Sequence, residues 1–159
     1  MTLSIRKDPT ILVCVDSSNA SLIALKYASI KAQKLGFRIE ILSILEPSHK
    51  NLLFGSQTIG KEKRGKMEKH IQKAIADIFK DKDYIPSVEI REGDITNEIL
   101  KEVKNNPNCV TLVFGKSHSS SQSDNTVLPK MAQNISRKIR IPILIVPENI
   151  DENIFNLML

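Results

Sequence analysis

Five short apolar runs, separated by longer amphipathic segments, constrain the fold of this chain more than any other feature of its sequence. The runs span Thr10–Asp16, Arg38–Glu46, Ser87–Gly93, Cys109–Gly115 and Pro142–Pro147. Most of them are continuous and rich in β-branched residues, which is typical of strands buried on both faces. Strands that alternate with helices form parallel sheets through right-handed crossovers. The sequence therefore predicts an open, Rossmann-like α/β fold, in which a five-stranded parallel sheet carries helices on both faces.

Capping residues predict the boundaries of two helices. The helix after the first strand has candidate N-caps at Ser17, Ser18 and Asn19. Gly36 follows the last apolar residue of that helix, and glycine is the usual residue at a helix C-terminus. Asp94 can cap the helix that follows the third strand.

The other two helical segments are less sharply bounded. A loop is predicted over Pro47–Thr58, followed by a basic helix that runs to about Phe79. The last connecting helix follows a serine-rich stretch and carries apolar residues along one side, namely Leu128, Met131, Ile135 and Ile139. Proline stands at both ends of the final apolar run, which favours an edge position for that strand.

Length and composition favour a single domain. With 159 residues, of which 41% are hydrophobic, the chain suits one domain over residues 1–159. We expect a core over residues 9–148 and an apolar tail over 149–159 that docks on the domain or on a partner subunit. No segment approaches the roughly 18 consecutive apolar residues of a membrane helix, so we expect a soluble, cytoplasmic protein. Cys14 and Cys109 lie within apolar runs, where reduced thiols pack as small hydrophobic groups.

The positive charge of the chain gathers in one segment. The net charge is +5, and this segment contributes Lys61, Lys63, Arg64, Lys66, Lys69 and Lys73. Apolar residues at helical spacing share the segment, so its cations are expected to form the solvated face of an amphipathic helix. Aromatic residues make up only 4% of the chain, and nucleic acid is therefore not an expected partner. The alternative, a surface for anionic polymers, predicts salt-dependent retention on heparin or DNA.

Ligands of open α/β sheets bind beyond the carboxyl ends of the strands, where the strand order reverses. Four stretches near these strand ends are informative in their order and spacing, namely Ile11-Leu12-Val13-Cys14-Val15-Asp16-Ser17-Ser18, Arg91-Glu92-Gly93-Asp94-Ile95-Thr96-Asn97-Glu98-Ile99-Leu100, Val113-Phe114-Gly115 and Ile141-Pro142-Ile143-Leu144-Ile145-Val146-Pro147. Through them the chain resembles the universal stress protein family over residues 9–148. The resemblance implies an adenine nucleotide alpha hydrolase-like fold with strand order 3-2-1-4-5. It also implies a homodimer paired through the fifth strand, and a stress-related role without established catalysis.

A phosphate-binding motif follows the fourth strand in the nucleotide-binding branch of that family, and it reads Gly-x-x-Gly, nine residues, then Gly-Ser or Gly-Thr. Such glycines let backbone N–H groups approach phosphate oxygens at a helix N-terminus. Here Gly115 matches the first glycine, but His118, Pro129 and Lys130 stand at the other positions, and the spacer is one residue longer. The motif is therefore degenerate, because Pro129 has no N–H to donate. Lys116 and Lys130 can still attract a phosphate by charge.

The resemblance also assigns residues from the first two strands to a nucleotide site. Asp16 would lie near the base and ribose, and Ile44 would pack on adenine. Judged from the residues alone, Asp16 can instead accept backbone hydrogen bonds at a turn, and Ile44 can be a core residue. The candidate site for ATP or another adenine nucleotide comprises Asp16, Ser17, Ile44, Gly115, Lys116, His118 and Lys130.

The sequence predicts no catalytic or metal site. His49, His70 and His118 lack metal-ligand spacing, so each is expected on the surface or in a loop. A Gly-x-Ser-x-Gly elbow and a Walker loop are absent, and serines follow Asp16 where a receiver domain needs acidic residues. Two functions stay open: a non-enzymatic stress-response dimer that acts through protein partners with nucleotide binding weakened or lost, and an adenine-nucleotide-binding protein with at most slow hydrolysis.

Overall fold

The computed structural model describes residues 8–47, 56–118 and 132–159. Its strands are β1 Thr10–Cys14, β2 Arg38–Leu45, β3 Ser87–Glu92, β4 Cys109–Lys116 and β5 Ile143–Pro147. Its helices are α1 Asn19–Leu35, α3 Ser56–Ile78, α4 Ile95–Asn105 and α6 Glu152–Met158. Residues 132–136 are also helical.

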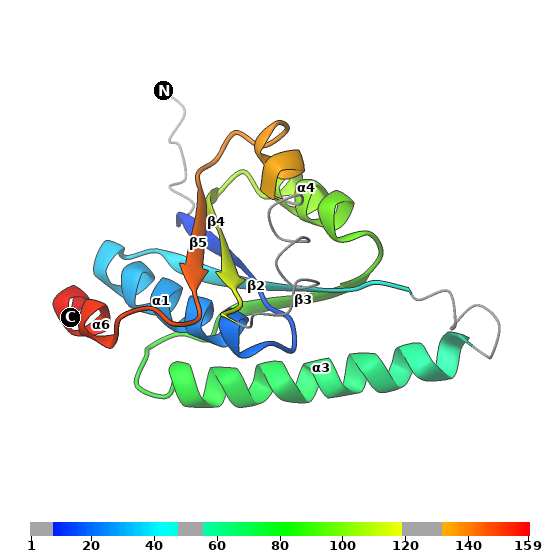
Figure 1. The fold of residues 1–159 in the computed structure, drawn as a ribbon, viewed down its shortest axis with the longest axis horizontal. Helices are drawn as coiled ribbons and strands as arrows, with labels where there is room; N and C mark the ends of the chain where they lie inside the picture. The colour runs from blue at the N-terminus through cyan, green and yellow to red at the C-terminus, as the bar shows by residue number, and fades with distance from the viewer. Residues whose placement is uncertain (1–7, 48–55, 119–131) are drawn as a thin grey trace, which may run out of the picture.

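The strands form one parallel sheet in the order β3-β2-β1-β4-β5 (Figure 1). This confirms the predicted fold class and strand order, including the edge position of β5. Central strand β1 pairs on one side with β2 and on the other with β4, so that Val13 faces both Ile41 and Val113. The chain runs from β1 outward through β2 to β3 on one side and then crosses to β4 and β5 on the other, which places the switch point of the sheet between β1 and β4.

Helices cover both faces of the sheet, and each face has its own core. On one face α1 and α3 pack against strand residues such as Ile11 and Val13. On the other face the neighbouring residue Leu12 packs with Ile99 of α4 and with Ile135. This alternation explains the continuous apolar runs of the central strands, because both faces of each strand are buried.

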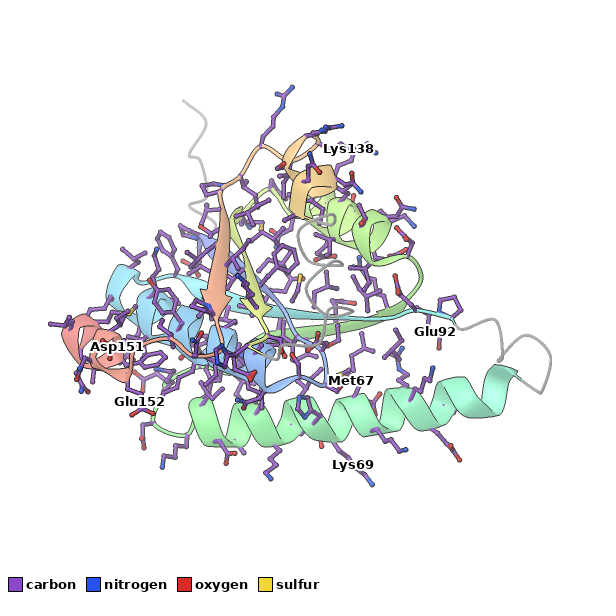
Figure 2. All side chains as sticks on the ribbon, viewed as in Figure 1. Met67, Lys69, Glu92, Lys138, Asp151 and Glu152 are labelled. Carbon is purple, nitrogen blue, oxygen red and sulfur yellow. The ribbon has the colours of Figure 1, made fainter. Side chains whose placement is uncertain are left out.

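The long helix α3 is amphipathic, as its sequence predicts. Figure 2 shows Met67 pointing toward the sheet and Lys69 pointing away from it into solvent. Buried residues Ile71 and Ala74 continue the inner face of α3. Lys69 thus lies on the outer side of α3, whereas Arg64 reaches the sheet and donates from Nη1 to Ile90 O at 3.1 Å.

Two predicted helix starts and one helix end are confirmed in detail. Ser18 caps α1 by accepting a hydrogen bond from Ser21 N, and Asp94 caps α4 by accepting one from Asn97 N. Gly36 ends α1 in the left-handed conformation with φ 69°, which an L side chain rarely adopts.

Two other predicted boundaries are wrong by a few residues. Helix α3 begins at Ser56, so residues 56–58 are helical and do not belong to the predicted loop. Polar residues are tolerated in a first helical turn, so composition did not mark this start. The helix at 132–136 ends before Ile139, although Ile139 N still donates to Ile135 O at 2.9 Å. Leu128 and Met131 of that prediction lie outside the described residues.

The C-terminal segment folds back onto its own domain. Phe155 of α6 is buried and meets Tyr27 of α1 edge-to-face, with ring centroids 6.5 Å apart. The ammonium group of Lys26 lies 4.7 Å from the centroid of the Phe155 ring, and Lys34 Nζ donates to Leu159 O at 2.6 Å. Leu157 stays 85% exposed. The tail thus docks on α1 through one aromatic side chain and leaves other apolar groups on the surface.

Candidate functional site

The turn after β1 lies at the switch point and contains the first candidate residues. Asp16 is exposed, and its Oδ1 accepts hydrogen bonds from Ser18 N at 2.8 Å and from Ser18 Oγ. Asp16 N donates to Ser21 Oγ at 3.2 Å, and that hydroxyl donates back to Asp16 O at 3.1 Å. Neighbouring Ser17 is also exposed. The carboxylate of Asp16 therefore organises the turn that starts α1, as the alternative interpretation of this residue expects.

Gly115 packs the backbone of β4 closely against the first turn of α1. A Cβ built on this residue would lie 2.3 Å from Ala20 O, 2.4 Å from Ala20 C and 2.7 Å from Ser21 N. No real Cβ tolerates such distances to backbone atoms, so this strand end can meet the first turn of α1 only as glycine. Packing against α1 alone therefore explains why residue 115 is a glycine, and no ligand is needed. A glycine inside an apolar strand is the sequence signal for such an approach.

The residues that follow Gly115 point away from the core. Lys116 and His118 are both exposed, and Lys116 O accepts a hydrogen bond from Glu148 N at 2.8 Å. Ser21 N lies against Gly115, and Ser21 Oγ is hydrogen-bonded to Asp16. Asp16, Gly115 and Lys116 therefore lie together at the carboxyl ends of β1 and β4. Pro129 and Lys130, the remaining motif positions, lie outside the described residues.

The side chains beneath this edge are apolar. Ile44 in β2 is half-buried and packs against the α4-side core, as does Cys14 at the end of β1. Burial raises the pKa of the Cys14 thiol far above its usual range, and it raises the pKa of Cys109 to about 11. Both thiols are free, and at neutral pH both are uncharged and poorly nucleophilic.

A buried serine ties the strands together below the candidate site, and the sequence analysis did not single it out. Ser43 in β2 is fully buried, and its Oγ donates to Val15 O. Val15 N in turn donates to Leu42 O at 2.9 Å. These bonds extend the pairing of β1 and β2 beyond the last residue of β1. In the sequence, this role is indicated only by a single serine within the apolar run of β2.

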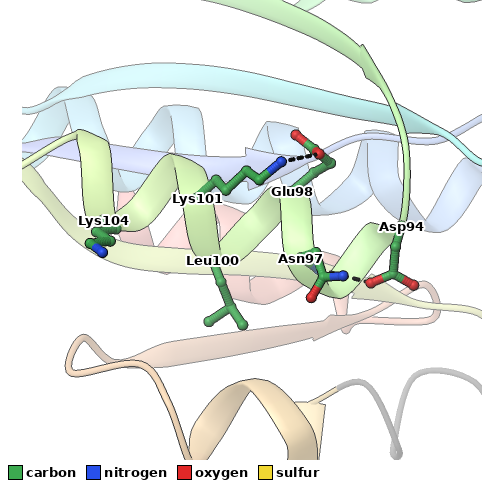
Figure 3. Close-up of a pocket in the computed structure, with 6 residues that line it drawn as sticks. All are labelled: Asp94, Asn97, Glu98, Leu100, Lys101 and Lys104. Atoms are coloured by element: carbon green, nitrogen blue, oxygen red, sulfur yellow. Dashed lines mark hydrogen bonds and ion pairs between the residues drawn. The ribbon is translucent and has the colours of Figure 1, made fainter.

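A shallow hollow of about 340 Å³ runs along α4 (Figure 3). Its lining residues are Asp94, Asn97, Glu98, Leu100, Lys101 and Lys104. Lys101 Nζ binds Glu98 Oε1 at 3.0 Å, and Asp94 Oδ2 accepts from Asn97 N at 2.9 Å. The polar groups largely satisfy one another, and the hollow lacks the apolar enclosure of a typical ligand pocket. We therefore do not place a binding site there.

The prediction that His70 lies on the surface or in a loop is wrong. His70 is part of α3, and its Nε2 is buried without a hydrogen-bond partner among the described residues. It follows Met67 by one helical turn and precedes buried Ile71, so it sits at the border of the apolar face. His118 is exposed as predicted, and His49 lies outside the described residues. Within the described ranges, His, Cys, Asp and Glu form no group of three that could hold a metal ion.

The parallel order β3-β2-β1-β4-β5 with polar residues at the switch point defines an adenine nucleotide alpha hydrolase-like fold. A sequence model of the Universal stress protein family matches residues 9–147, and the chain belongs to that family. No protein with a curated description matches the sequence significantly. In the described part of the chain, no helix has the length and apolar character needed to cross a membrane.

Solved structures show the same fold at low sequence identity. Universal stress protein UspA from Lactobacillus plantarum superposes with TM-score 0.71 at 16% identity, covering 88% of this chain and 98% of that one. A universal stress protein in complex with cAMP gives TM-score 0.63 at 15% identity, with 89% and 98% covered. The Archaeoglobus fulgidus universal stress protein in complex with dAMP gives TM-score 0.53 at 14% identity, with 88% and 98% covered.

Proposed function

We propose that this chain is a non-enzymatic, cytoplasmic stress-response protein that acts through protein contacts and has weakened or lost adenine nucleotide binding. The observation that carries the proposal is the contact between Gly115 and Ala20. Gly115 is the one glycine of the nucleotide motif that the sequence keeps, and packing against α1 already accounts for it. The presence of Gly115 is therefore no evidence that the chain binds a phosphate.

The other candidate residues support the same interpretation. The carboxylate of Asp16 is engaged by Ser18, and Ile44 packs into the α4-side core. Pro129 has no N–H to offer a phosphate, and a side chain at His118 hinders close backbone approach. Asp16 and Ile44 thus have structural roles that operate without nucleotide.

The rival function is an adenine nucleotide binder, and one observation favours it. Lys116 is exposed at the carboxyl edge of the sheet, where an anion would bind. Two relatives of the same fold are described in complex with cAMP and with dAMP, so adenine nucleotides are the ligand class to test. In this case Lys116 and Lys130 would replace lost backbone donors with charge.

Isothermal titration calorimetry with ATP, ADP, AMP and cAMP separates the two functions. We expect no binding heat at millimolar nucleotide. A micromolar affinity for ATP that falls at least tenfold in Lys130→Ala would establish the rival function instead. Lys69→Ala is the matched control, because Lys69 is exposed on the outer side of α3 and its loss should leave any nucleotide affinity unchanged.

We further propose that the chain forms a homodimer through β5. This edge strand carries Ile145 with 42% of its surface exposed, and an exposed apolar edge strand is a template for pairing. Analytical ultracentrifugation should show a dimer that Ile145→Glu converts to a monomer. Ile85→Glu is the control, because Ile85 is 81% exposed but precedes the opposite edge strand. A wild-type monomer at tens of micromolar would contradict this proposal.

A further inference from the structure

A buried cluster of charged side chains joins α4 to the β2–β3 half of the sheet. Glu40 in β2 is only 6% exposed and Glu102 in α4 only 7%. Asn106, the C-cap residue of α4, donates from Nδ2 to Glu40 Oε2 at 2.8 Å. Arg91 in β3 forms an ion pair with Glu102 Oε2. Three secondary-structure elements therefore meet through these four side chains.

Negative charge outweighs positive charge around this cluster. Glu89 Oε2 lies 3.8 Å from Arg91 Nε, and Glu98 Oε2 lies 4.0 Å from Arg91 Nη1. Three carboxyl groups, those of Glu89, Glu98 and Glu102, thus gather around the guanidinium of Arg91, and Glu40 lies beside Glu102. Lys101, which pairs with Glu98, is 65% exposed, so it contributes little positive charge to the buried cluster. Glu40 and Glu102 are both buried, and only Glu102 pairs with a cation, so the two carboxylates are costly to keep fully charged.

A proton on Glu40 relieves this imbalance. Burial, hydrogen bonding with Glu102 and the charge of Glu102 raise the pKa of Glu40 to about 7. The charge of Glu89 raises this pKa further, whereas the hydrogen bond from Asn106 lowers it. The Cys109 thiol of β4 also faces this cluster, but its own pKa of about 11 keeps it neutral here. The raised pKa of Glu40 brings a charge change of this buried cluster close to neutral pH.

We propose that Glu40 and Glu102 share one proton and form a pH-sensitive latch, which holds α4 on β2 at acidic pH and loosens it as the pH rises above neutrality. The latch lies close to the end of the helix that leads into β4. Asn106 Oδ1 accepts from Asn108 N at 3.1 Å, and Asn106 O accepts from Cys109 N at 3.1 Å. Release of Glu40 would thus free the α4–β4 connection.

The sign of the effect follows from proton linkage. The pKa of Glu40 is about 7 in the folded chain against an ordinary value of 4.5. Its stabilising contribution is therefore complete below about pH 4.5 and is lost as the pH rises through about 7. The difference corresponds to a decrease of up to about 300-fold in the folding equilibrium constant at alkaline pH.

Urea denaturation between pH 5.5 and 8.5 tests the latch in the full chain. Glu40→Gln keeps the size and hydrogen-bonding groups of the protonated acid, so it should remove most of the fall in stability with rising pH. Glu68→Gln, at an exposed residue of α3, should keep the wild-type pH dependence. Equal pH dependence in wild type and Glu40→Gln would overturn the proposal.

Two measurements keep the test decisive if the variant folds poorly. In the wild-type protein, the side-chain carboxyl carbon of Glu40 should titrate by NMR with a midpoint near 7. A midpoint near the ordinary 4.5 would overturn the latch. Amide hydrogen exchange, corrected for its intrinsic pH dependence, should show protection of α4 falling relative to α1 between pH 6 and 8.5.

Discussion

Replacing Gly115 by alanine tests how closely β4 is packed on α1. The new Cβ would lie 2.3 Å from Ala20 O and 2.4 Å from Ala20 C. Ordinary contacts need more than 3.4 Å, so the first turn of α1 must move about 1 Å away from the strand. The obstructing atoms belong to the backbone, and no side-chain rotation can relieve them.

The cost of this movement can be estimated from overpacking elsewhere. Extra methyl groups in packed cores destabilise proteins by about 1–3 kcal/mol, and a clash with backbone belongs at the upper end. About 3 kcal/mol corresponds to a fall in Tm of about 6–12 °C for a domain of this size. Urea denaturation followed by circular dichroism gives the free energy directly, provided that the slope with denaturant is unchanged.

Gly65→Ala provides the matched control for this substitution. Gly65 lies within α3, and a Cβ there would meet nothing within 4 Å. Alanine should therefore stabilise the helix by about 0.5–1 kcal/mol. If Gly115→Ala retains wild-type stability within about 0.5 kcal/mol, β4 and α1 are not packed as closely as described.

Two further substitutions test the tail and a helix cap. Phe155→Ala should cost about 3 kcal/mol by calorimetric unfolding, because it removes the buried ring that docks α6 on α1, whereas exposed Leu157→Ala should change stability by less than about 0.5 kcal/mol. Equal effects of the two would contradict the docking described above. Asp94→Ala should cost about 1 kcal/mol in urea denaturation through loss of the bond from Asn97 N. An unchanged midpoint would show that this cap contributes nothing.

Features that depend on local sequence could be predicted in this chain. The central strands are buried on both faces, and this is why their apolar runs are continuous. Gly36 and Asp94 mark helix ends through their own backbone and side-chain chemistry, so no tertiary information was needed. The edge position of β5 followed from its flanking prolines.

Features that depend on long-range packing could not be predicted. Gly115 was assigned to a phosphate motif, and only the fold reveals that Ala20 occupies the space of its missing side chain. Glu40 reads as an ordinary polar residue in its strand, yet α4 buries it against Glu102, a residue far away in the sequence. The burial of His70 Nε2 likewise depends on how α3 packs on the sheet.

The proposed weakening or loss of nucleotide binding follows from the backbone donors that the phosphate motif lacks. The most direct test restores them in the variant His118→Gly, Pro129→Gly, Lys130→Ser and titrates it with ATP by calorimetry beside the wild type. We expect no binding heat from the wild type. We expect the variant to bind ATP with an affinity at least tenfold above the weakest that the assay detects. Micromolar ATP binding by the wild type, unchanged in the variant, would contradict the proposed loss of backbone donors.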